Sequence, residues 1–281
     1  DPERVIFTAN ATDALNLAIQ GLVGKGDHVI STRLEHNSVL RPLFHLQKQL
    51  GVELDLVGFD EQGRVRVEEI EKAIKANTKL VICTHASNVL GTVQPVAAIA
   101  EMCAGYGIPL LIDTAQSAGH IPVEMDKWKI AALAFTGHKA LLGPTGTGGL
   151  ILSPTLEVRP TRYGGTGFES SSLYQPESFP FRLESGTLNT LGIFGLKAGI
   201  EYLQEEGMES AHQREMALIR RLYEGLSTLP GVKIHSPEPT AADVPVLTCT
   251  VEGLASEDVG TILDGDFSIA VRTGLHCAPL V

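Results

Sequence analysis

The stretch "PLLIDTAQ" (109–116) joins a short run of large apolar residues directly to a carboxylate. Apolar runs of this length are typical of strands that are buried on both faces of a sheet. Similar runs occur at "KLVICTHA" (79–86) and "ALAFTG" (132–137), and helical patterns at 67–74 and 96–107 lie between strand-like runs. This alternation predicts an α/β fold, with a mostly parallel sheet covered by helices on both sides.

The composition of the chain restricts the class of protein. The 281 residues are 43% hydrophobic and 20% charged, which is typical of soluble globular proteins. No apolar run approaches the ~18 to 20 residues of a membrane helix, and no signal peptide is visible, so we expect a cytoplasmic protein without a membrane span. The net charge is −11 without a basic stripe, which argues against nucleic-acid binding. The four cysteines are far apart, which favours reduced thiols over a metal site or a disulfide scaffold.

Two domains of unequal size are expected. Residues 1–205 form the predicted large domain, and residues 206–281 form a small α+β domain that ends before it can close. Residues 153–189 are rich in Gly, Ser, Pro, Tyr and Phe, which predicts a long and functional loop region. A helical region follows at roughly 190–228, and the small domain then reads as strand, helix and a last strand at "IAVRTG" (269–274).

Polar residues follow the carboxyl ends of the predicted strands, where ligands bind in α/β sheets. Asp113 alone at such a place is commonly a helix cap, and Lys139 alone is usually a surface residue. Their joint placement at neighbouring strand ends favours a site. Pyridoxal phosphate needs a lysine for its covalent attachment and a carboxylate that keeps its ring nitrogen protonated, so this pair of residues suits that cofactor.

A phosphate site is predicted where "TANATDALNLAIQGL" (8–22) leads from a polar turn into a helix. The free N–H groups and the dipole of a helix N-terminus favour phosphate, although Thr12 and Asp13 can equally be plain N-caps. The Gly-rich "GPTGTGGL" (143–150) suggests a nucleoside triphosphatase instead. That alternative fails because a P-loop needs its lysine at the end of the loop and a helix after it, whereas Lys139 precedes this loop and a strand-like run follows.

Five segments taken together resemble one known family. They are "THASNVLGT" (84–92), "LLIDTAQSAGH" (110–120), "FTGHKALLGPTGTG" (135–148), "FRLESGTLNT" (181–190) and "IAVRTGLHCAPL" (269–280). They resemble the class V aminotransferase superfamily of fold-type-I pyridoxal-phosphate enzymes, and within it the cysteine desulfurases and selenocysteine lyases. The resemblance runs along essentially the whole chain. It implies the fold-type-I transferase architecture, with a seven-stranded sheet in the large domain.

The resemblance implies a role for each matching residue of the cofactor pocket. Lys139 would hold the cofactor covalently and move the Cα proton of the substrate. Asp113 would pair with the ring nitrogen, and Gln116 would contact the ring hydroxyl. His36 would stack on the ring face, with a solvent-exposed helix-cap histidine as the alternative. The phosphate would be held by Ala11 (through its backbone), Thr12, Thr136 and His138.

The resemblance also implies groups outside this pocket. Thr187 would reach the phosphate of a partner subunit, which implies a homodimer. Asn88 would help to bind the substrate carboxylate, and Arg272 would line the entrance. Relative to the family, the chain is expected to be truncated at both ends, so that a carboxylate-binding arginine after Val281 is missing, and Asn37 stands where many relatives have a second histidine.

Cys277 would be the nucleophile of such an enzyme. A free thiol with the ordinary pKa of ~8.5 is only a few per cent thiolate at neutral pH, and His276 or Arg272 beside it can raise that fraction. Taken alone, Cys277 is more simply a small buried hydrophobe. The remaining cysteines fit that description better, because they lie in apolar patterns: Cys83, Cys103 and Cys249.

The sequence therefore predicts a pyridoxal-phosphate cysteine desulfurase. It would convert L-cysteine to L-alanine and leave a persulfide on Cys277 for an acceptor protein. The alternatives are a selenocysteine lyase, another class V lyase, transaminase or epimerase, and a degenerate scaffold that binds the cofactor without turnover.

Overall fold

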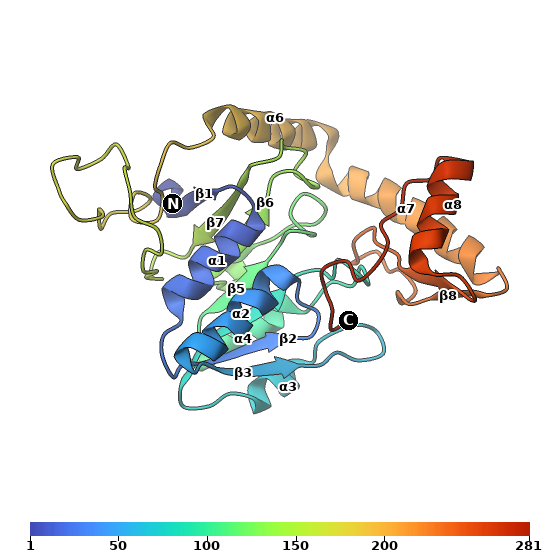
Figure 1. The fold of residues 1–281 in the computed structure, drawn as a ribbon, viewed down its shortest axis with the longest axis horizontal. Helices are drawn as coiled ribbons and strands as arrows, with labels where there is room; N and C mark the ends of the chain where they lie inside the picture. The colour runs from blue at the N-terminus through green and yellow to red at the C-terminus, as the bar shows by residue number, and fades with distance from the viewer.

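A seven-stranded sheet forms the centre of the computed structural model, which describes all 281 residues (Figure 1). Its strands are β1 (Val5–Thr8), β2 (His28–Thr32), β3 (Glu53–Val57), β4 (Thr78–Thr84), β5 (Leu110–Asp113), β6 (Ala132–Thr136) and β7 (Gly148–Leu152). The spatial order is β1-β7-β6-β5-β4-β2-β3. Neighbours from β3 to β6 pair in parallel, and β7 pairs antiparallel with both β1 and β6. The predicted mostly parallel seven-stranded sheet is confirmed.

Helices cover both faces of the sheet, which explains why its central strands are apolar along their whole length. Successive side chains of a strand point to opposite faces, so the neighbours Val81 and Ile82 of β4 belong to two different hydrophobic clusters. The cluster of Ile82 includes Leu15 and Leu43, and the cluster of Val81 includes Ile99. The covering helices are α1 (Ala11–Leu22) and α2 (Asn37–Leu50) on the first face, and α3 (Val67–Lys72) and α4 (Val96–Gly105) on the second.

Two of the cysteines lie in these cores, as predicted. Cys83 is 0% exposed on β4, and Cys103 is 1% exposed on α4. Cys249 is only half-buried, because it lies on a short strand outside the main sheet. A short helix, α5 (Met125–Trp128), precedes β6.

Residues 153–189 follow β7 and contain no helix or strand. They run as loops at the left of Figure 1. Tyr163, Leu173 and Tyr174 of this segment are strongly exposed. The predicted loop region is therefore present. It leads into α6 (Thr190–Glu206), whose Leu196 packs into the second core cluster.

A smaller unit follows α6 and lies to the right in Figure 1. It consists of α7 (Met208–Ser227), an antiparallel pair of β8 (Val232–Ile234) and β9 (Cys249–Val251), and α8 (Ser256–Phe267). The predicted single helical region is two helices, because Gly207 with φ +81° interrupts it. The predicted last strand at 269–274 is wrong: the small sheet contains only β8 and β9, so this segment runs without a strand partner. No helix in the structure has both the length and the apolar character needed to cross a membrane.

Candidate active site

The carboxyl ends of the parallel strands open into a cavity of about 280 Å³. Its lining brings together residues that are far apart in the chain, and it includes these predicted site residues: Ala11, Thr12, His36, Asn88, Asp113, Gln116, Thr136, His138, Lys139 and Arg272. Two predicted residues, Thr187 and Cys277, do not line it. The topology explains the gathering, since parallel strands place their carboxyl ends at one edge of the sheet.

Asp113 and Lys139 supply a carboxylate and an amine to this cavity. Asp113 is the last residue of β5 and is 5% exposed. Burial raises the pKa of its carboxyl, while the Ala115 N–H, which donates to Oδ1 at 2.9 Å, and the Lys139 charge oppose the rise. Lys139 follows β6 and is open to solvent in the cleft. Desolvation by the surrounding protein nevertheless lowers the pKa of its amine. The positive charge of Arg272 lowers this pKa further, whereas the negative charge of Asp113 raises it. A lowered pKa increases the share of neutral, nucleophilic amine at neutral pH.

The N-terminus of α1 lines one end of the cavity. Asn10 is the N-cap, and its Oδ1 accepts the Asp13 N–H at 3.0 Å. The alternative in which Thr12 or Asp13 is the N-cap is therefore wrong. Thr12 Oγ1 instead lies 2.6 Å from Ser38 Oγ, at the edge of the cavity. Free amide groups at a helix N-terminus beside hydroxyl groups suit a phosphate.

His36 lies where the cavity meets the start of α2. It is the N-cap of α2, where its Nδ1 accepts the Ser38 N–H at 3.0 Å. It also lines the cavity and is half-buried rather than exposed. Burial, with the positive charges of Lys139 and Arg272, lowers the pKa of its imidazole. A neutral ring at this place can stack on an aromatic cofactor.

Cys277 lies on a turn beside the cavity, where its thiol contacts Arg272, one of the lining residues. Its φ is +59° and that of His276 is +51°, which are uncommon values for residues with a Cβ. Two hydrogen bonds from the large domain hold this turn: Asn37 N donates to Cys277 O and Asn88 Nδ2 donates to His276 O, both at 2.7 Å. The thiol Sγ accepts a hydrogen bond from Arg272 Nη2 at 3.1 Å. Arg272 is thus the cation that contacts the thiol.

A second, open cavity of about 540 Å³ has Cys277 in its lining and shares Thr12, His36 and Ser38 with the first. It is lined by His36 and Cys277 together with Arg41 and His45 of α2. Cys277 is therefore reached from solvent through this groove. Burial and the Arg272 charge lower the pKa of His276, so this neighbour is a neutral imidazole at neutral pH.

Thr187 is exposed and lies in a separate cavity of about 220 Å³ with Asp13 and Arg162. Arg162 Nη1 contacts Asp13 Oδ1 at 3.0 Å. Thr187 thus does not line the cavity that contains Lys139 and Asp113.

The sequence argument missed Glu35 and Ser38. Glu35 is 0% exposed, and its Oε1 accepts Thr32 Oγ1–H at 2.7 Å and Thr84 N–H at 2.8 Å. Burial raises the pKa of its carboxyl to about 8, and these hydrogen bonds only partly offset the rise. Ser38 joins Thr12 to His36. The run "LEHNS" (34–38), which begins two residues after the end of β2, is the signal that points to both, since it places several polar groups near a strand end.

The chain matches the aminotransferase class-V family model over residues 1–281. It belongs to this family. It is 34% identical to a probable cysteine desulfurase of Halalkalibacterium halodurans, over 98% of this chain and 69% of that protein. The structure is similar to the apo structure of a cysteine desulfurase from Thermococcus onnurineus, with a TM-score of 0.93, 37% identity, and coverage of 100% of this chain and 71% of that one.

Enzymes of the class V family use pyridoxal 5'-phosphate. A C-DES mutant with glycine covalently linked to this cofactor is 25% identical, with a TM-score of 0.85 over 97% of this chain and 74% of that chain. The cavity fits such a cofactor on its own evidence. Lys139 offers an amine with a lowered pKa, Asp113 a buried carboxyl, and α1 an N-terminus beside hydroxyl groups. The resemblance found in the sequence is confirmed at the level of the family and its cofactor.

Proposed function

We propose that the protein is a pyridoxal-phosphate cysteine desulfurase that converts L-cysteine to L-alanine and leaves a persulfide on Cys277. One observation carries the proposal. A thiol held by Arg272 lies beside a cavity that contains Lys139 and Asp113. The cysteine desulfurases among its relatives and structural neighbours agree with this function.

The residues of the cavity divide the chemistry between them. Pyridoxal phosphate, when bound, supplies an electron sink for the substrate carbon. Lys139 would hold the cofactor through its amine, whose lowered pKa favours the neutral form, and the same amine could take the Cα proton of the substrate. The Asp113 carboxylate would keep a proton on the ring nitrogen, and the N-terminus of α1 would hold the phosphate. Asn88 and Arg272 face the entrance, where they bind and orient the substrate carboxylate.

Cys277 performs the sulfur transfer. Its thiolate attacks the sulfur of the substrate, so that an S–S bond forms and the Cβ–S bond breaks. The electron pair of the broken bond remains with the carbon skeleton, which takes up protons and leaves as alanine. The Arg272 guanidinium stabilises negative charge on Cys277 Sγ, because it donates to that atom at 3.1 Å.

We further propose the assembly in which this site works. Residues 1–205 form the cofactor-binding domain and residues 206–281 the small domain, which follows the break between α6 and α7 at Gly207. The exposed Thr187 reaches the phosphate of a second copy in a homodimer. An acceptor protein takes the sulfur through the open groove beside Cys277. The free cysteines suit the reducing conditions of the cytoplasm.

Alanine release from L-cysteine tests the function. Purified protein loaded with the cofactor is mixed with L-cysteine, and alanine and protein-bound persulfide are measured. Cys277→Ala should abolish both products while the visible absorption of the bound cofactor stays unchanged. The control Cys249→Ala should keep full activity, because Cys249 lies on β9 and does not line the cavity that contains Lys139 and Asp113. Alanine production by Cys277→Ala at the wild-type rate would refute the proposal and favour another class V reaction.

A further inference from the structure

The segment from Ala86 to Val93, here called the Asn88 loop, connects the active site with the small domain. It begins just after β4 and is closed by the bridge between Ala86 and Val93. Within it, Ser87 N donates to Thr92 O at 3.0 Å and Gly91 N donates to Ser87 O at 3.0 Å. These internal hydrogen bonds make the loop a compact unit. A displacement of its Val93 end is therefore expected to move Asn88 as well.

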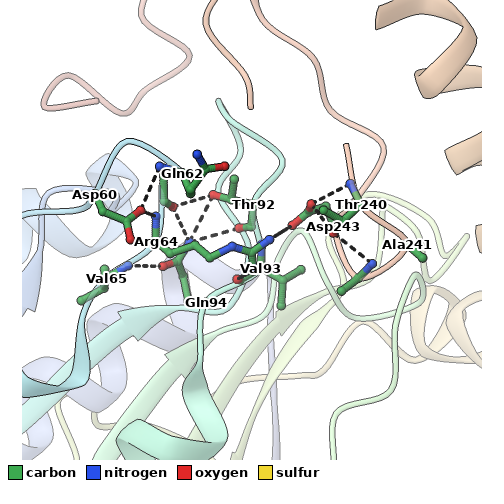
Figure 2. Close-up of polar contacts among 12 residues, drawn as sticks. Asp60, Gln62, Arg64, Val65, Thr92, Val93, Gln94, Thr240, Ala241 and Asp243 are labelled. Atoms are coloured by element: carbon green, nitrogen blue, oxygen red, sulfur yellow. Dashed lines mark hydrogen bonds and ion pairs between the residues drawn. The ribbon is translucent and has the colours of Figure 1, made fainter. Parts of the chain in front are cut away.

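The ion pair of Arg64 and Asp243 holds the Val93 end of this loop (Figure 2). Asp243 of the small domain accepts Val93 N–H at 3.1 Å and Arg64 Nη2–H at 2.9 Å. Arg64 in turn donates from Nη1 to Val93 O at 2.9 Å. Asp243 is 5% exposed, and Thr240 donates to its other oxygen from both N and Oγ1. The two charged side chains therefore occupy both backbone polar groups of Val93.

The small domain also contacts the middle of the Asn88 loop. Val244 N donates to Gly91 O at 2.9 Å, and Thr248 Oγ1 donates to Val89 O at 2.6 Å. Gly91 has φ +76°, and a Cβ there would lie 2.5 Å from Val246 O. The contact is thus close enough to fix the distance between the loop and the small domain.

The Asn88 end of the loop holds the turn that carries the thiol. Asn88 Nδ2 donates to His276 O at 2.7 Å, and the only other backbone anchor of the turn is Asn37 N on Cys277 O. His276 and Cys277 both have positive φ, a conformation that persists only where surrounding contacts impose it. Loss of the Asn88 contact would therefore release the turn toward ordinary backbone angles.

We propose that Arg64 and Asp243 are positioning residues for Cys277: they hold the Asn88 loop at Val93, and the loop holds the Cys277 turn beside the cavity. Neither side chain lines the cavity, so both act through Asn88. The catalytic consequence of this inference depends on the proposed desulfurase function, but the placement of the turn does not.

Hydrogen exchange at the Asn37 amide tests this placement directly, because that amide donates to Cys277 O. The variants are Asp243→Asn and Arg64→Gln, each measured as the cofactor-loaded protein. Both should exchange about tenfold faster or more at Asn37 than wild type, whereas amides of β4 and β5 should change less than about twofold. Arg64→Gln secures the test if Asp243→Asn fails to fold, because the Arg64 side chain is 35% exposed.

The matched control is Glu215→Gln. Glu215 on α7 also joins the small domain to the large one, through His120 Nδ1 at 2.9 Å, but it does not contact the Asn88 loop. Its removal should leave Asn37 exchange unchanged. The proposal is overturned if the Asn37 amide exchanges at the same rate in wild type, Asp243→Asn and Arg64→Gln. It is also overturned if exchange in β4 and β5 accelerates as much as at Asn37, because that marks a general loss of stability.

Enzyme kinetics test whether the position of the Cys277 turn affects catalysis. The rate constant for alanine release should fall about tenfold to a hundredfold in Arg64→Gln and Asp243→Asn, the range expected when a reacting group is displaced by up to an ångström. Cofactor affinity should stay within about twofold of wild type. Faster exchange with unchanged kinetics would overturn the positioning role. If wild type itself releases no alanine, the proposed function fails, while the exchange result still decides where the turn is held.

Discussion

Gly91→Ala tests how closely the small domain approaches the Asn88 loop. An alanine at φ +76° costs about 1–2 kcal/mol, because its Cβ crowds the following carbonyl in the left-handed region. At this site the Cβ would also lie 2.5 Å from Val246 O and 2.9 Å from Val244 O. Backbone oxygens cannot rotate away, so the segment must move and weaken the Val244 N to Gly91 O bond, which costs about 1 kcal/mol more. We expect a total loss of about 2–3 kcal/mol.

Gly51→Ala is the matched control. Gly51 caps α2 with φ +65°, and nothing lies within 4 Å of a Cβ placed there. It should therefore cost only the backbone term of about 1–2 kcal/mol. Urea unfolding, followed by circular dichroism and by the fluorescence of Trp128, the single tryptophan, measures both variants. A loss in Gly91→Ala no larger than that in Gly51→Ala would refute the close approach of the two backbones.

Two further predictions concern the cleft itself. Lys139→Ala should lose the visible absorption of bound cofactor after gel filtration, because Lys139 is the only lysine that lines the cavity; retained absorption would contradict the role of Lys139. Burial raises the pKa of Glu35 from its ordinary 4.5 to about 8, so the folded protein keeps a proton that the unfolded chain releases. Wild-type stability should therefore fall between pH 4.5 and 8 relative to Glu35→Gln, by on the order of a few kcal/mol in urea unfolding, and parallel pH curves of the two proteins would contradict this.

The sheet and the centre of the cleft were predictable from the sequence, because both depend on local patterns. Buried parallel strands need continuous apolar residues, so "LVICT" and "PLLI" identify β4 and β5. Polar residues directly after such strands then lie at one edge of the sheet. Asp113 and Lys139 were placed in one site on this ground, and the structure brings both into one cavity.

Predictions failed where a residue depends on partners that local pattern does not reveal. The apolar run at 269–274 has the composition of a strand, but no strand edge pairs with it. Thr12 and Asp13 have the chemistry of an N-cap, yet the helix begins at Ala11 and Asn10 caps it. In both cases neighbouring backbone, rather than residue type, decides the outcome.

Cys277 shows most clearly what the sequence reveals by itself and what requires the tertiary structure. Taken alone, the stretch "GLHCAP" (274–279) favours a buried thiol, and only the order of motifs along the chain points to a nucleophile. Tertiary packing alone decides what holds that thiol, because its turn is anchored by Asn37 and Asn88, far away in the chain, and the loop of Asn88 is gripped by Arg64 and Asp243. Hydrogen bonds between residues more than a hundred positions apart leave no periodic trace in the sequence, so only the folded chain reveals them.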